Sequence, residues 1–183
     1  MNGERISLLV VWHSRTGAAR QLAVAATRGA RRSLGLAASG GARQDGSATR
    51  PISIDCVHAS RVDAQQMCAA SAYLFVAPEN LASLTGVMKE FFDRNYYGVL
   101  DRIAGRPYAV IVAAGSDGQG AVRQIERIAT GWRLKAVAEP IIVITHAQTA
   151  EAILAPKRVP PEELARAAEL GEALAQGLAM GIF

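Results

Sequence analysis

Five short runs of apolar, often β-branched residues recur along the chain, and none of them alternates strictly between apolar and polar positions. A strand without alternation is typical of a sheet that is covered on both faces. The runs predict strands over residues 6–12, 52–57, 72–77, 108–113 and 136–144.

Stretches with helical character separate these runs, and the last begins with proline, which is favoured in the first turn of a helix. They predict helices over residues 16–34, 64–70, 85–96, 120–133 and 161–180. Strands that alternate with helices indicate an α/β fold, in which a parallel sheet has helices on both faces and the connections are right-handed. A length of 183 residues suits a single domain over residues 1–183.

One segment breaks the pattern. Residues 35–51, GLAASGGARQDGSATRP, are small, polar and rich in glycine. We expect a mobile surface loop that leads into the second strand, and we assign it no function.

Composition narrows the class of protein. Half of the residues are hydrophobic and the net charge is only +4, without a basic stripe interleaved with aromatics, so nucleic acid is not an expected partner. No apolar run approaches the ~20 residues that span a bilayer, and the first one is too short for a secretion signal. Cys56 and Cys68 form no CxxC pair and no metal-ligand cluster with the three histidines. We therefore expect a soluble, cytoplasmic protein without a metal site or a membrane partner.

The unusual loops follow the first, third and fourth predicted strands. They read HSRTGAA over residues 13–19, PENLASL over 78–84 and AGSDGQG over 114–120. Ligands of open parallel sheets bind outside the carboxyl ends of the strands, where the strand order reverses. If the order is 2-1-3-4-5, these three loops meet at one crevice.

The first loop suits a phosphate. A helix that begins near Thr16 presents unpaired backbone N–H groups and the positive end of its dipole, and Gly17 allows close approach to an anion. Ser14 and Thr16 add hydroxyl donors, while Arg15 either contributes charge or points to solvent. The competing interpretation is that Ser14 or Thr16 only caps the helix, because such caps are very common.

Several other chemistries lack their motifs. The chain has no GxxxxGK[ST] for a nucleoside triphosphate, and no GxGxxG follows the first strand. Ser116 does not lie in a GxSxG, and the three histidines have no evident carboxylate partner in the sequence, which favours structural roles for them.

Together, HSRTGAARQLA, APENLASLTGVMKEFFDR and GRPYAVIVAAGSDGQG resemble the flavodoxin-like superfamily of FMN proteins, in its branch of small NAD(P)H-dependent FMN oxidoreductases and quinone reductases. The likeness covers nearly the whole chain in the expected order. It implies a flavodoxin-like three-layer sandwich with a five-stranded parallel sheet of order 2-1-3-4-5.

The resemblance also implies a binding site for FMN. The first loop would hold the phosphate. The family pattern is close to S-x-T-G-N-T, and this chain has Ala18 and Ala19 in the last two places. A side-chain hydroxyl is thereby lost, so we expect weaker binding through the backbone N–H groups that remain. Because the backbone would approach the anion at Gly17, a β-branched residue there is expected to weaken FMN binding with little damage to the fold. The third-strand loop would follow the isoalloxazine ring and the fourth-strand loop its pyrimidine side, although ordinary turns explain each loop equally well in isolation. The expected cofactor-binding residues are Ser14, Arg15, Thr16, Gly17, Ala18, Ala19, Pro78, Glu79, Asn80, Leu81, Gly115, Ser116, Asp117, Gly118 and Gln119.

Comparison with the carrier flavodoxins of the same superfamily favours an enzyme over an electron carrier. Carrier flavodoxins are usually acidic and clamp the flavin between aromatic side chains, whereas PENLASL and AGSDGQG contain no aromatic residue. An open flavin face would let NADH or NADPH, and then a quinone, free flavin or similar small acceptor, stack and exchange hydride with the cofactor, so no side chain is named as catalytic. The alternatives are a flavodoxin-type electron carrier or non-enzymatic flavin-binding redox module, and an FMN-free interaction protein that kept the fold.

Two further features have open interpretations. Members of the superfamily commonly form dimers or tetramers, so a homodimer or homotetramer is implied, and Tyr96 and Tyr97 suit either its interface or the core. A solvated helix face or attraction of NADPH phosphates explains the basic residues Arg123, Arg127, Arg133 and Lys135.

Overall fold

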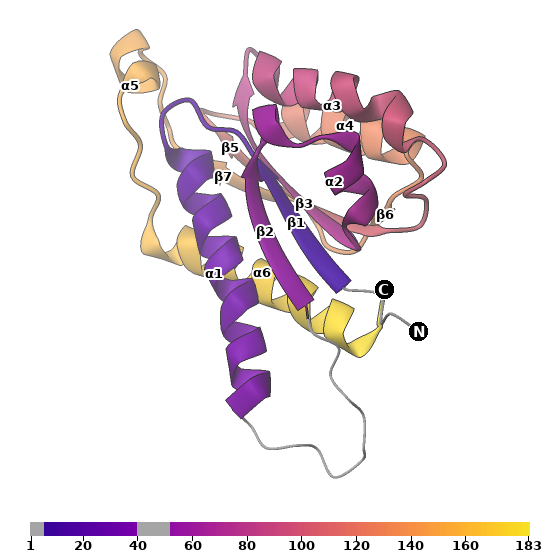
Figure 1. Ribbon diagram of the computed structural model, residues 1–183. Coiled ribbons are helices and arrows are strands. Elements are labelled where there is room, and N and C mark those ends of the chain that lie inside the picture. Colours follow the sequence, from indigo (N-terminus) through magenta and orange to yellow (C-terminus); the bar gives the residue numbers. More distant parts are fainter. Residues whose placement is uncertain (1–5, 40–51) are drawn as a thin grey trace.

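Seven strands form one sheet with helices packed on both of its faces (Figure 1). The structure, a computed structural model, describes residues 6–39 and 52–183. The strands are β1 (Ile6–Trp12), β2 (Ile52–His58), β3 (Ala72–Asn80), β4 (Ser83–Leu84), β5 (Pro107–Ala114), β6 (Lys135–Ala136) and β7 (Ile141–Ile144). The helices are α1 (Ala18–Ser39), a short 3-10 turn (Ala59–Arg61), α2 (Ala64–Ala69), α3 (Gly86–Val99), α4 (Gln119–Gly131), α5 (Ala150–Leu154) and α6 (Pro161–Met180).

The main strands are parallel and follow the order β2-β1-β3-β5, with β6 and β7 beyond β5. Because β4 is a short antiparallel addition to the end of β3, this is the predicted order 2-1-3-4-5 of the five principal strands. The flavodoxin-like fold is thereby confirmed. The strand order reverses between β1 and β3, so the crevice expected at that point lies at their carboxyl ends.

The fifth predicted strand, 136–144, is interrupted rather than continuous. β6 pairs with the beginning of β5 and β7 with its end. Pro140, directly before β7, has no N–H to donate to the ladder, which explains why the pairing stops between the two pieces. Only Val137 N continues it, donating to Tyr108 O at 3.1 Å.

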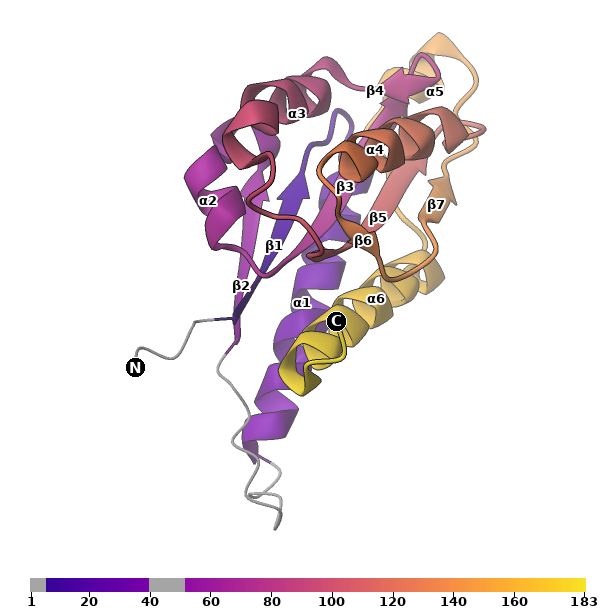
Figure 2. The same ribbon diagram turned by 90° about the vertical axis from the view of Figure 1, so that its right-hand side faces the viewer.

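Helices α1 and α6 cover one face of the sheet and cross each other closely (Figures 1 and 2). Glycine at two positions permits this approach: a Cβ on Gly29 would lie 1.9 Å from Ala168 O, and one on Gly171 would lie 2.0 Å from Ala26 O. The apolar faces of both helices bury the inward side chains of β1, β3 and β5. Helix α1 begins at Ala18, shortly after β1 ends at Trp12.

Helices α2, α3 and α4 cover the other face. Phe75 of β3 contacts Phe91 and Phe92 of α3, and Trp132 just after α4 packs against both phenylalanines. Tyr96 belongs to this layer, since its ring stacks on Trp132, while Tyr97 is 84% exposed. Tyr96 is thus a partly buried residue that packs against the core.

Helix boundaries differ from the predictions in two places. Helix α1 continues to Ser39, so residues 35–39 are helical rather than part of a loop, and residues 40–51 of the predicted loop lie outside the described residues. Helix α5 was not predicted at all. The remaining helices lie within three residues of their predicted ends, and α6 coincides with the prediction. In the described part of the chain, no helix has the length and apolar character to cross a membrane.

Candidate functional site

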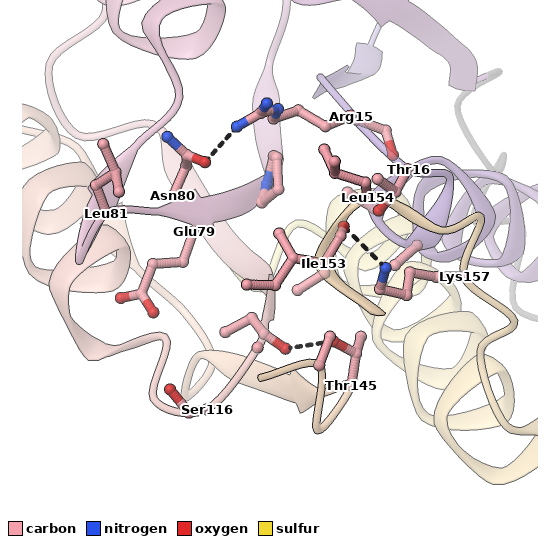
Figure 3. A pocket seen from close by; sticks show the side chains of 18 of the residues that line it. Arg15, Thr16, Glu79, Asn80, Leu81, Ser116, Thr145, Ile153, Leu154 and Lys157 are labelled. Carbon is pink, nitrogen blue, oxygen red and sulfur yellow. Dashed lines mark hydrogen bonds between the residues drawn. The ribbon is translucent and has the colours of Figure 1, made fainter. Parts of the chain in front are cut away.

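The loops after β1, β3 and β5 meet around one pocket at the carboxyl end of the sheet (Figure 3). Its volume is about 280 Å³, near the lower end of the range for small-molecule sites. Eleven predicted cofactor-binding residues line it: Ser14, Arg15, Thr16, Ala18, Ala19, Pro78, Glu79, Asn80, Leu81, Gly115 and Ser116. The other lining residues are Ala82, Ala113, Ala114, Thr145, Ala147, Ile153, Leu154 and Lys157.

The first loop turns directly into α1. Gly17 has a φ of +97°, a conformation that favours glycine, and its carbonyl accepts the first bond of the helix from Gln21 N at 3.1 Å. Ser14 Oγ accepts the Gly17 N–H at 3.1 Å, so its hydroxyl caps the loop. Helical geometry leaves the next three amides, of Ala18, Ala19 and Arg20, without partners inside the helix. Ser14 therefore bonds within the loop rather than to an amide of the helix, and amides that suit an anion remain beside it.

Gly17 itself does not line the pocket. A Cβ there would approach Gln21 Nε2 at 3.7 Å and Lys157 O at 3.9 Å, both ordinary contact distances. The glycine is needed for its backbone conformation. The expectation that a β-branched residue here would do little damage to the fold is therefore wrong, because an L residue is strained at this φ.

Arg15 and Asn80 both line the pocket, and their side chains point toward one another (Figure 3). Arg15 extends from the β1 loop, and its guanidinium donates to Asn80 Oδ1 at the end of β3. The bond joins the loop predicted to hold the phosphate to the loop predicted to follow the flavin ring. Neither side chain is packed in the core, so both can rearrange around a ligand.

Glu79 has a structural task that the sequence did not reveal. Its carboxylate accepts the N–H of Gly118 at 2.8 Å and that of Gly120 at 3.1 Å, at the beginning of α4. The negative charge lies at the positive end of the helix dipole, which is favourable. Three predicted residues of the loop after β5, Asp117, Gly118 and Gln119, do not line the pocket. The amide of Gly118 instead donates to the Glu79 carboxylate.

Leu81 and Ala82 form the tight turn between β3 and β4. Asn80 pairs with Ser83, leaving two residues in the loop, and these have φ values of +53° and +55°. A two-residue turn with both φ values positive is of type I′, which usually contains Asn-Gly. Residues with a Cβ are strained at these φ values. Leu81 is also 91% exposed, so the turn places an apolar side chain in solvent beside the pocket.

Residues 145–157, after β7, form the wall that sequence reasoning missed. Thr145 Oγ1 donates to Ala114 O at 3.0 Å, and Ile153 and Leu154 of α5 present apolar side chains to the pocket (Figure 3). Thr149 caps α5 by accepting Ala152 N at 3.2 Å. The signal was available, because the rule for parallel sheets applies to the loop after the last strand as it does to the others.

His13 lies beside the first loop and holds it against α3. Its Nδ1 is 2.9 Å from Thr85 Oγ1, and its ring makes an edge contact with His58. Burial, the nearby His58 and Arg15 lower the pKa of His13, so the neutral form is favoured. Burial and Arg61 likewise lower the pKa of His58. Both histidines have structural contacts, as predicted.

The residues present fit a flavin nucleotide. At one end the first turn of α1, Thr16 and Lys157 offer amides, a hydroxyl and a positive charge, which suit a phosphate. Away from that end much of the wall is aliphatic, and none of the lining residues in the described part of the chain is aromatic. Within the described residues, no group of three or more His, Cys, Asp or Glu side chains could hold a metal ion.

Comparisons with known proteins agree with this geometry. A flavodoxin from the domain Archaea is 14% identical, with a TM-score of 0.69 and coverage of 94% of this chain and 99% of the other. A WrbA-like flavodoxin from Agrobacterium tumefaciens is 14% identical, with a TM-score of 0.61 and coverage of 96% and 98%. A flavodiiron core from Synechocystis is 13% identical with a TM-score of 0.70, but the 98% of this chain that aligns spans only 37% of that protein. At these identities the likeness concerns the fold.

The sequence itself identifies the family. No curated protein sequence matches the chain. The family model described as NADPH-dependent FMN reductase matches residues 55–149, which include the β3 loop, the β5 loop and the strands between them. The chain is therefore a flavodoxin-like member of the NADPH-dependent FMN reductase family.

Proposed function

We propose that the protein is an FMN-dependent oxidoreductase that takes hydride from NADH or NADPH and delivers it to a quinone, free flavin or similar small acceptor. The observation that carries the proposal is that the loops after β1, β3 and β5 converge on one pocket beside the first turn of α1. The family match supports the same chemistry.

The chain's contribution would be binding and orientation. The amides of Ala18 and Ala19 would receive the phosphate, and Thr16 would add a hydroxyl. Asn80 and the backbone of Gly115, which both line the pocket, would meet the edge of the ring. FMN would supply the redox chemistry, by accepting a hydride and passing it on.

Absence of aromatic side chains from the lining favours an enzyme over a carrier. A ring clamped between aromatics is shielded from flat reactants, whereas the described lining of this pocket leaves room for a nicotinamide or quinone to stack. The donor and the acceptor would use this space in turn, giving a ping-pong reaction. Positioning at stacking distance would then account for much of the rate, without a side-chain acid or base.

The proposed assembly is a homodimer or homotetramer in the cytoplasm. Tyr97 and Leu81, which are 84% and 91% exposed, offer apolar surface that a second copy would cover. Light scattering of the purified protein checks the assembly. A strictly monomeric protein would contradict this part of the proposal while leaving the chemistry intact.

Anaerobic titration tests the proposed reaction. Protein loaded with FMN is mixed with increasing NADPH, and separately with NADH, while the visible flavin absorbance is followed. Loss of that absorbance without a partner reductase is expected with at least one nucleotide, and a quinone or free FMN should then restore it. FMN binding without reduction by either nucleotide would favour a carrier. Failure to bind FMN would instead favour an interaction protein.

A further inference from the structure

The pocket carries an unbalanced positive charge at its phosphate end. Of the described residues that line it, three are ionisable: Arg15, Glu79 and Lys157. Glu79 is bonded to the amides of α4, away from α1, and Arg15 is bonded to Asn80. Arg15 points toward the end of β3, whereas Lys157 is the cation beside the first turn of α1, where Thr16 lies close to it in Figure 3.

Lys157 belongs to a short segment, residues 155–159, here called the strap. Hydrogen bonds attach the strap to the beginning of α1. Lys157 N donates to Thr16 O at 2.8 Å. The side chain of Gln21 binds the strap twice, because Nε2 donates to Lys157 O at 2.7 Å and Oε1 accepts Val159 N at 3.2 Å. The main chain of Lys157 is therefore anchored to the same turn that presents the free amides.

The ammonium group of Lys157 has only neutral partners. Its Nζ donates to Ala152 O at 2.5 Å, to Ile153 O at 3.0 Å and to Ala155 O at 2.6 Å. Among the ion pairs of the described residues, none includes Lys157. Its side chain is partly buried in the pocket wall, so the charge is held in place and is not neutralised by a carboxylate.

We propose that Lys157 is a phosphate-binding residue of this site and makes it selective for the phosphorylated flavin, FMN, over riboflavin. The inference rests on the proposed function. A dianionic phosphate at the free amides of α1 would lie close to this ammonium and would be a stronger acceptor than the carbonyls that now hold it. Lys157 would thereby offset the side-chain hydroxyl that Ala18 and Ala19 cannot supply.

Paired affinities for two flavins test the assignment. Dissociation constants of FMN and riboflavin are measured by quenching of flavin fluorescence for the unsubstituted protein and for Lys157→Met. The variant is expected to bind FMN roughly tenfold more weakly, the loss of one charge-assisted hydrogen bond, with riboflavin affinity nearly unchanged. Lys157→Arg should retain most of the preference for FMN.

Arg158→Met is the matched control. It removes the same charge from the next residue of the strap, and Arg158 is exposed and does not line the pocket. Its FMN affinity should stay within about twofold of the unsubstituted protein. If Lys157→Met fails to fold, Lys157→Gln replaces it, since an amide can still donate to a carbonyl of α5.

The possible outcomes separate this inference from the proposed function. Equal weakening of FMN and riboflavin would show that Lys157 only supports the strap, and unchanged FMN affinity would show that it does not meet the phosphate; either result overturns the assignment. In both cases the unsubstituted protein still binds FMN, so the proposed function stands. A protein that binds neither flavin overturns both.

Discussion

The carboxylate of Glu79, at the end of β3, accepts the N–H groups of Gly118 and Gly120 at 2.8 and 3.1 Å. Two loops that are 39 residues apart in the chain are joined by these bonds. A residue expected to face a flavin ring thus also organises the beginning of α4. The close packing at this point is shown by Gly120, where a Cβ would lie 2.0 Å from Ala82 O.

Replacement of Glu79 should lower stability as well as ligand affinity. Glu79→Ala removes both acceptors and leaves two amides of α4 unpaired, so the free energy of unfolding is expected to fall by about 1–2 kcal/mol. Urea denaturation followed by circular dichroism measures the loss. Glu169→Ala, at an exposed position of α6, is the control and should change stability by less than about 0.5 kcal/mol. A Glu79 variant as stable as the control would contradict the capping role.

Gly17 should be sensitive to substitution because of its backbone. Gly17→Ala forces a residue with a Cβ into a φ of +97°, and the expected cost is about 1–2 kcal/mol of unfolding free energy even without ligand. Gly86→Ala is the comparison, because a Cβ there meets nothing within 4 Å and Gly86 is absent from the positive-φ glycines. Thermal unfolding of both variants distinguishes the cases. Full stability of Gly17→Ala would show that this backbone conformation does not require glycine.

The β3–β4 turn should accept a stabilising change. Leu81→Asn combined with Ala82→Gly installs the residues that a type I′ turn prefers and removes an exposed leucine, with an expected gain of about 1 kcal/mol. Chemical denaturation of the double variant checks this. The same alanine-to-glycine change at Ala165, exposed within α6, should instead cost about 1 kcal/mol. If the turn variant is also destabilised, the strain assigned to this turn is absent.

Stability should fall as the solution becomes mildly acidic. The pKa of His13 is lowered below its ordinary value of 6.5 in the folded protein, so the unfolded chain takes up a proton more readily. Stabilisation is therefore complete above pH ~6.5 and is lost as the pH falls from there toward the pKa of the folded protein. Urea midpoints across this range measure the slope, which His13→Gln should reduce. Because the pKa of His58 is also lowered, adding His58→Gln should flatten it further. An unchanged slope in the double variant would rule out these histidines as its source.

Much of the site could be placed from sequence because parallel strands expose their carboxyl ends at one edge. Once β1, β3 and β5 were identified, Thr16, Asn80 and Ser116 had to follow them at that edge. The direction of each side chain and amide was not determined in this way. Ser14 Oγ accepts the Gly17 N–H, and the Gly118 N–H donates to Glu79. Each group had several possible partners nearby, and only the folded structure shows which one it binds.

The sequence by itself determined the layers of the fold. Apolar runs without alternation required a sheet buried on both faces, and helices between them required parallel strands. Their spacing along the chain also indicated the loops that carry polar residues. These features depend on local periodicity and on burial, which are written in consecutive residues.

Only the tertiary structure decided what completes the pocket. Lys157 is 136 residues from Gln21, yet the two are hydrogen-bonded, because α6 packs across α1 and brings the strap onto its first turn. Helix α5 has five residues and gives almost no periodic signal, and a short helix of this kind is stabilised by its contacts rather than by its sequence. The positive charge at the phosphate end therefore arises from packing between helices that are distant in the chain, which no local pattern encodes.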